Sequence, residues 1–156
     1  MGNFNGRGRM EAWQDFLRAH KVVVGALERE MLEEGGLPLA WYDVLLNLDA
    51  APQGRLRLQT LAEAVMLSRS GLTRLVDRLT QAGHVERVPC VEDKRGVYAA
   101  LTRAGKEALR KAAPGHLRGI REHFTLHLSP DDAEALRRAL GKVIAAARRE
   151  GAAAPP

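Results

Sequence analysis

The sequence predicts a mainly helical fold with a small β-hairpin, which makes an α+β protein in which helices dominate. Three observations predict it. Apolar residues recur at helical spacing along most of the chain. One stretch after Gly83 alternates as a hairpin does, and a length of 156 residues suits a single domain that buries its own core.

The first expected element is a long helix that begins at Met10 and ends at the glycine pair 35–36. It carries one apolar stripe, made of Trp13, Phe16, Leu17, His20, Val24, Leu27 and Met31. Residues 1–9 are rich in glycine, asparagine and arginine, so we expect them to form a flexible arm. A more apolar helix is expected over residues 39–48, and the alternation of residues 55–58 indicates a short strand.

Two short helices are predicted in the middle of the chain. The first is marked by Leu61, Ala62, Val65 and Met66. Ser68 is a suitable N-cap for the second, and Gly83 lies just past its end. Its apolar stripe is Leu72, Leu75, Val76 and Leu79, and its opposite face carries Arg69, Ser70, Thr73, Arg74, Asp77 and Arg78.

The hairpin and two long helices complete the chain. Residues 84–88 and 97–101 alternate as paired strands and are joined by a charged turn, residues 89–96. Thr102 is expected to cap the next helix, and Pro114 is expected to kink it. Ser129 and Pro130 open the last helix, whose positive end suits Asp131 and Asp132. Residues 151–156 are expected to be a frayed tail.

Strand, helix, turn, helix and hairpin, in this order, make a winged helix-turn-helix lobe, in which the hairpin is the wing. A recognition helix must show polar and basic side chains on one face to reach base edges and phosphates. The charge distribution fits this reading. Of 24 basic and 19 acidic residues, 10 basic and 5 acidic lie within residues 55–106, whereas the remainder holds 14 of each. Such a surface is typical of polyanion binding, and also of an ordinary solvated face.

Four segments resemble the multiple antibiotic resistance regulator (MarR) family. They are residues 61–79, the stretch Ala-Gly-His-Val-Glu-Arg ending at Arg87, the wing tip Glu-Asp-Lys-Arg-Gly ending at Gly96, and Ala-Leu-Thr-Arg-Ala-Gly ending at Gly105. The most specific part is Asp-x-Arg followed by Leu-Thr-x-x-Gly. The resemblance spans roughly residues 10–148. It implies an obligate homodimer that regulates transcription, usually by repression that a small molecule relieves.

The resemblance also implies a division of the chain. Residues 10–36 and 103–150 would form a helical dimerisation region, and residues 37–102 the DNA-binding lobe. Two recognition helices would meet a pseudo-palindromic operator about 34 Å apart. The residues expected on double-stranded DNA are Ser68, Arg69, Ser70, Thr73, Arg74, Arg78, Lys94, Arg95 and Gly96. Arg95 would enter the minor groove, and Asp93 would orient the wing rather than touch DNA.

An effector pocket is expected between the dimerisation region and the lobe, as is usual in that family. Trp13, Phe16, His20 and Tyr42 offer aromatic faces with a few polar tips, which suits a small aromatic or phenolic acid. Arg18 or Lys21 would supply a cation. The alternative for all of these aromatic side chains is ordinary core packing.

Other constellations leave alternatives open. Asp77 either pairs with a neighbouring arginine or accepts from a cytosine. Cys90 suggests a redox-responsive regulator, because Arg87, Lys94 and Arg95 are close in sequence, or it is incidental. His116, His123 and His127 share one helix face, and the last two have helical zinc-ligand spacing, but solvated or interface histidines are favoured, and we expect no metal.

Composition and motifs also restrict the class of protein. No apolar run approaches the roughly 20 residues of a membrane span, and the polar start carries no secretory signal, so a cytoplasmic protein without a membrane partner is expected. We find no nucleophile–base pair, phosphate loop or catalytic carboxylate pair, so neither an enzyme nor a cofactor is expected. A protein-interaction module on a winged-helix scaffold is the rival reading, and the local basic excess argues against it.

Overall fold

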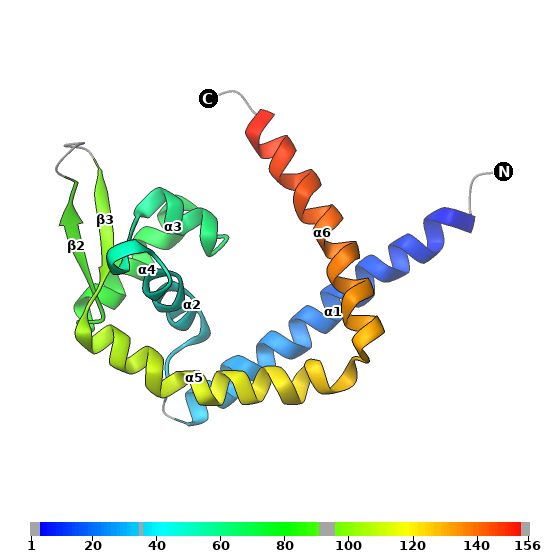
Figure 1. Ribbon diagram of the computed structural model, residues 1–156, viewed down its shortest axis with the longest axis horizontal. Helices are drawn as coiled ribbons and strands as arrows, with labels where there is room; N and C mark the ends of the chain where they lie inside the picture. The colour runs from blue at the N-terminus through cyan, green and yellow to red at the C-terminus, as the bar shows by residue number, and fades with distance from the viewer. Residues whose placement is uncertain (1–3, 35, 91–95, 154–156) are drawn as a thin grey trace.

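A computed structural model of the chain describes residues 4–34, 36–90 and 96–153. A small lobe contains the shorter helices and the sheet (Figure 1). The long helices α1 (Phe4–Glu33) and α5 (Arg103–His123) lead away from it, and α6 (Pro130–Ala153) follows from the far end of α5. The described residues are therefore mainly helical with one small antiparallel sheet, and the predicted fold class is confirmed.

The lobe contains three helices and three strands of the described chain. In chain order they are α2 (Leu39–Asp49), the 3-10 turn η1 (Pro52–Gly54), β1 (Arg55–Arg57), α3 (Leu58–Ala64), α4 (Arg69–Gln81), β2 (Val85–Pro89) and β3 (Val97–Leu101). The sheet order is β1-β3-β2, so the short strand predicted at residues 55–58 lies beside β3, the second hairpin strand. Leu56 and Arg87 lie opposite Ala99 from the two sides.

The core of the lobe forms around α2. Val44, Leu45 and Leu48 of this helix are fully buried, which explains why its sequence is more apolar than that of the other helices. The stripe predicted on α4 is buried in the same core, since Leu72, Leu75, Val76 and Leu79 lie in one cluster with Leu61 of α3 and Ala99 of β3, and α4 packs on α3 and β2. The buried face predicted for this helix is thereby confirmed.

The C-terminal half of helix α1 packs against α5. Ala26, Leu27 and Met31, in this half, are buried. Leu27 packs on Gly119 of α5, where an added Cβ would lie 2.5 Å from the leucine side chain. Two ion pairs, Glu34 with Arg118 and Glu30 with His123, also connect α1 to α5.

Several boundaries differ from the sequence expectation. Helix α1 begins at Phe4 rather than Met10, so residues 4–9, expected in a flexible arm, are helical. Helix α6 continues to Ala153, into the expected tail. Glycine lowers helix stability by only about 1 kcal/mol per residue, and its presence marks a boundary weakly. Helix α5 runs through Pro114 and ends at His123, which places His127 in a separate 3-10 turn, η2 (Thr125–His127).

No helix in the described residues is both long and apolar enough to cross a membrane.

Candidate nucleic-acid interface

Helix α4 has a well-defined start. Ser68 is extended, with φ −64° and ψ 154°, and its hydroxyl accepts a hydrogen bond from the Gly71 amide at 3.1 Å. The turn before it reverses the chain through Met66, which has a φ of 54° and is 91% exposed. The predicted N-cap is confirmed, and it fixes the end of the helix that a groove-binding helix would present to DNA.

The outer face of α4 is polar and fully accessible. Its exposed side chains are Arg69, Ser70, Thr73, Arg74, Asp77 and Arg78. Within the described residues, Arg69 and Arg74 have no carboxylate partner, so both guanidinium groups can reach phosphate or base edges. Thr73 donates its hydroxyl proton to the Arg69 carbonyl at 2.8 Å, which leaves that hydroxyl free to accept.

Asp77 is the exception on this face because it is already paired. Arg87 of β2 donates to the Asp77 carboxylate at 2.8 Å and approaches the Thr73 carbonyl at 3.5 Å. The partner is therefore an arginine of the wing, not one on the same helix. Of the two readings left open by the sequence, this contact favours pairing over acceptance from cytosine.

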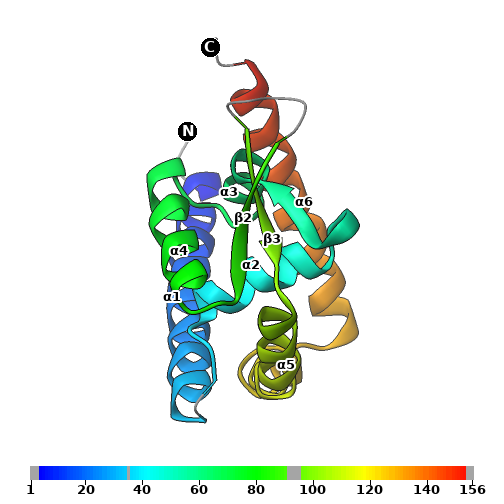
Figure 2. The ribbon, with the colours of Figure 1, turned by 90° about the vertical axis from the view of Figure 1, so that its left-hand side faces the viewer.

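The hairpin of β2 and β3, the wing, stands beside α4, and Figure 2 shows it from the side of the lobe. Its ladder extends to the Cys90 amide, which donates to the Gly96 carbonyl at 2.9 Å. Gly96 thus lies at the base of the tip, directly before β3. Asp93, Lys94 and Arg95 lie outside the described residues, and their roles stay predictions.

Thr102 and Gly105 explain the Leu-Thr-x-x-Gly motif at the end of the wing. The Thr102 hydroxyl accepts from the Gly105 amide at 3.0 Å, which caps α5 as predicted, and donates to the Gly83 carbonyl at 2.7 Å. An added Cβ at Gly105 would lie 2.1 Å from the His84 carbonyl oxygen. The motif therefore holds the start of α5 against the end of α4, where Gly83 turns with a φ of 76°.

Of the three basic residues expected near Cys90, Arg87 lies within the described residues, whereas Lys94 and Arg95 lie outside them. Cys90 is 5% exposed, and the guanidinium that approaches its sulfur, at 3.5 Å, belongs to Arg57 of β1. Arg87 points instead to Asp77. A redox-sensing thiol needs access to its oxidant, so this burial weighs against the redox reading.

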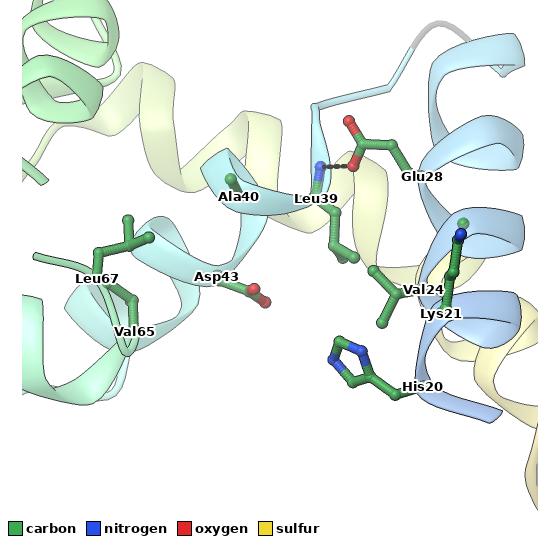
Figure 3. Close-up of a pocket in the computed structure, with 10 residues that line it drawn as sticks. His20, Lys21, Val24, Glu28, Leu39, Ala40, Asp43, Val65 and Leu67 are labelled. Atoms are coloured by element: carbon green, nitrogen blue, oxygen red, sulfur yellow. Dashed lines mark hydrogen bonds between the residues drawn. The ribbon is translucent and has the colours of Figure 1, made fainter. Parts of the chain in front are cut away.

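A pocket of about 580 Å3 lies between α1, α2 and the segment that joins α3 to α4 (Figure 3). It is lined by His20, Lys21, Val24, Gly25, Glu28, Leu39, Ala40, Asp43, Val65 and Leu67. Its place agrees with the junction expected for an effector site.

The four aromatic residues expected at this site are only partly brought together. His20 lines the pocket, and so does Lys21, one of the two cations considered. Trp13 and Phe16 lie further along α1 with stacked rings 6.1 Å apart, and both are exposed. Tyr42 is buried with its ring 4.3 Å from that of His116. The second cation considered, Arg18, pairs with Asp15 at 3.5 Å.

Two carboxylates that line the pocket, those of Glu28 and Asp43, were not predicted from the sequence. Glu28 accepts from the Leu39 amide at 2.7 Å and so caps α2, whose own N-cap residue, Pro38, makes no side-chain bond. Burial raises the pKa of Asp43, His116 lowers it and Glu28 raises it further. The sequence offered one sign of a polar site here, because Asp43 is the single acidic residue in the mostly apolar segment 39–48.

The three histidines with helical spacing have separate partners. His116 packs against Tyr42, and burial lowers its pKa although Asp43 opposes this. His123 pairs with Glu30 of α1, and His127 contacts the Glu122 carbonyl at 2.9 Å. The geometry does not bring them to a common point, and the described residues contain no group of three or more histidine, cysteine or acidic side chains arranged for a metal.

Comparison with known proteins adds a family model, described as MarR family, that matches residues 35–96. A curated relative, the uncharacterized HTH-type transcriptional regulator YkoM of Bacillus subtilis, is 33% identical over 127 residues, which cover 81% of this chain and 80% of the relative. Two solved structures from Streptomyces coelicolor are also similar. Both are described as MarR family transcriptional regulators.

The first of these structures, AbsC, has a TM-score of 0.84 and 34% identity, and the match covers 89% of this chain and 93% of AbsC. The second, Sco3205, was solved in complex with DNA. It has a TM-score of 0.82 and 33% identity, with 86% of this chain and 84% of Sco3205 covered. These relatives are regulators of transcription rather than enzymes, in agreement with the prediction from the sequence.

Proposed function

The chain belongs to the MarR family of DNA-binding transcriptional regulators, and from this premise we propose that it is a homodimeric repressor whose DNA affinity a small aromatic or phenolic molecule modulates. It acts in the cytoplasm on a pseudo-palindromic operator. Residues 37–102 form the DNA-binding lobe, and residues 10–36 and 103–150 form the dimerisation region.

The observation that carries the proposal is the outer face of α4. This helix is capped at Ser68, anchored by a fully apolar inner face, and shows Arg69 and Arg74 to solvent without a carboxylate partner in the described part of the chain. The major groove admits a helix, and exposed guanidinium groups on it bind guanine edges or phosphates. The DNA contacts are proposed for Ser68, Arg69, Ser70, Thr73, Arg74, Arg78, Lys94, Arg95 and Gly96.

The exposed apolar side chains of the long helices support a homodimer. On α1 they include Met10, Trp13, Phe16 and Leu17; beyond the lobe they include Leu117, Phe124, Leu126, Val143 and Ile144. Large exposed apolar patches mark interaction surfaces, and a two-fold dimer buries the same patch of both copies. Two-fold symmetry would also place one recognition helix on each half of a palindrome.

Ligand control follows from the place of the pocket. Val65 and Leu67 form one wall, and Leu67 directly precedes the Ser68 cap of α4. A bound molecule that fills this space therefore contacts the segment that sets the position of the recognition helix. It lowers DNA affinity only if it prefers the arrangement that does not fit DNA.

The proposal is tested by DNA binding over a salt series. The protein is titrated with duplexes from the region upstream of its own gene and with shuffled duplexes of equal composition. We expect one upstream duplex to bind more tightly than its shuffled copy, by at least about a thousandfold. Binding to both should weaken steeply as salt rises, because lysine and arginine displace counterions from phosphate.

Three variants locate the contact. Arg74→Ala and Arg95→Ala should each weaken binding and reduce the salt slope by about 1. Arg110→Ala, an equally exposed arginine on α5, should do neither. Unchanged binding in Arg74→Ala would exclude this face of α4. If wild type binds no duplex even after unfolding and refolding to remove a retained ligand, the chain is an interaction module instead.

A further inference from the structure

The pocket between α1 and α2 has the size of a ligand site, and both apolar and charged side chains line it. Its volume of about 580 Å3 lies within the range of small-molecule pockets. Val24 and Leu39 form one apolar wall, and Val65 and Leu67 form another. An apolar, ring-sized body fits such walls. The head group of the ligand is then selected by the polar side chains between them.

Asp43 is the polar group best placed to select it. Figure 3 shows its carboxylate pointing from α2 across the pocket towards His20 and Val24 of α1. Among the described residues, the side chain of Asp43 forms neither a hydrogen bond nor an ion pair. Burial raises the pKa of Asp43, His116 opposes this and Glu28 raises it further, so the net direction is upward and the site disfavours further negative charge.

The other charged residues do not reverse this balance. Glu28 is a second carboxylate, although its Oε2 is engaged by the Leu39 amide at 2.7 Å. Lys21 is the one cation with a permanent charge among the lining residues, and in Figure 3 it lies along α1 beyond Val24, away from Asp43. In the part of the chain that the structure describes, His116 is the one cationic group that acts on Asp43, and burial lowers its pKa, so it counters the carboxylate only weakly. A ligand carboxylate placed next to Asp43 would meet like charge, whereas an ammonium group would meet opposite charge.

We propose that this pocket binds a small organic cation, an aromatic ring bearing a protonated amine, with the ammonium group on Asp43 and the ring between Val24 and Leu67. This inference rests on the proposed function, since it names the ligand class of the effector site. It replaces the phenolic acid expected from the aromatic residues alone. The ring contacts Leu67, which directly precedes the Ser68 cap of α4, so binding displaces α4 and weakens DNA binding.

The test uses three probes with the same ring and different head groups: 2-phenylethylamine, 2-phenylethanol and phenylacetate. Their dissociation constants are measured by calorimetry at about neutral pH for wild type, Asp43→Asn and the control Asp131→Asn. Asparagine keeps the size of the side chain and removes its charge. Asp131 lies in the first turn of α6, remote from the pocket, and its replacement changes the net charge by the same amount.

Wild type should bind the amine about fivefold more tightly than the alcohol, and phenylacetate most weakly. Asp43→Asn should lose the preference for the amine while keeping affinity for the alcohol. Asp131→Asn should behave as wild type. Equal affinities for the three probes, preference for phenylacetate, an unchanged preference in Asp43→Asn, or no binding of any probe would each overturn the proposal.

Operator binding, measured without ligand and then with each probe, separates this inference from the proposed function. Loss of DNA affinity with the amine alone supports both. If wild type binds its operator but the amine shows no preference in calorimetry, only the ligand class is wrong. If the amine binds but no duplex does, the regulator function is wrong and the pocket stands.

Discussion

Arg87 links the wing to α4 through one guanidinium group. It contacts the Asp77 carboxylate at 2.8 Å and the Thr73 carbonyl at 3.5 Å, both on α4. The Arg87 side chain is 32% exposed and that of Asp77 is 53% exposed, so the pair contributes only about 0–1 kcal/mol to folding after solvent screening. Its main effect is geometric, because it fixes the angle between β2 and α4.

Replacement of Arg87 by lysine separates this geometric effect from charge. Both contacts come from one guanidinium nitrogen, Nη2. Lysine keeps the positive charge, but its ammonium on a flexible stem does not reproduce the position that the rigid guanidinium plane gives this nitrogen. We expect Arg87→Lys to weaken operator binding a few-fold, as measured by fluorescence anisotropy, with the salt slope of wild type, since no phosphate contact is lost. A slope reduced by about 1, as for Arg74→Ala, would instead make Arg87 a direct phosphate contact.

At this scale the sequence predicted local contacts and missed distant ones. The capping bonds of Ser68 and Thr102 and the turn at Gly83 act within a few residues of their own position, so these roles are visible in the pattern of the chain. The second bond of Thr102, to the Gly83 carbonyl, spans 19 residues and is not visible in that pattern. Asp77 and Cys90 find their arginines across the sheet or from another element. Such partners depend on tertiary packing, and neither helical nor strand periodicity encodes them.

Among the helices, α5 is the one whose stability depends most clearly on a single side chain, that of its N-cap Thr102. The Thr102 hydroxyl accepts from Gly105 and donates to the Gly83 carbonyl, so it caps α5 and also ties that helix to the end of α4. Loss of an N-cap hydroxyl costs about 1 kcal/mol, and up to about 2 kcal/mol in proteins.

Thr102→Ala should therefore lower the free energy of unfolding by about 1–2 kcal/mol in urea titrations. Thr60→Ala serves as control, because Thr60 is exposed on α3 and its hydroxyl makes no hydrogen bond in the described part of the chain. Equal stability of the two variants would show that the Thr102 cap has no energetic role.

The types and order of the elements were predictable, whereas their ends and partners were less so. Long periodic stretches such as α4 and α5 follow from apolar spacing alone. The start of α1 at Phe4 was missed because glycines at positions 6 and 8 resemble a loop composition. A strand of three residues, β1, carries too little pattern to reveal that it pairs with β3.

The whole molecule leaves apolar surface that one chain does not cover. In α1 the C-terminal half packs on α5, but Trp13 and Leu17 remain 54% and 44% exposed. Val143 and Ile144 of α6 are similarly open. The sequence stripes were sufficient to predict this surplus, since they exceed what a small lobe can bury. The lining of the pocket between α1 and α2 was not predictable in the same way, because it joins α1, α2 and the α3–α4 turn from distant parts of the chain.

If these surfaces form the dimer, a charge on one of them should dissociate it without unfolding the chain. Val143 is 65% exposed within one chain, so Val143→Asp has little effect on the monomer fold but buries an unpaired carboxylate in a dimer. We expect light scattering to give twice the chain mass for wild type and the single chain mass for the variant. Ala145→Asp, with the same charge on the opposite face of α6, should remain dimeric.

Because only a dimer presents two recognition helices at operator spacing, Val143→Asp should also lose operator affinity while its circular dichroism spectrum stays unchanged. A dimeric Val143→Asp protein would place the interface elsewhere on the long helices.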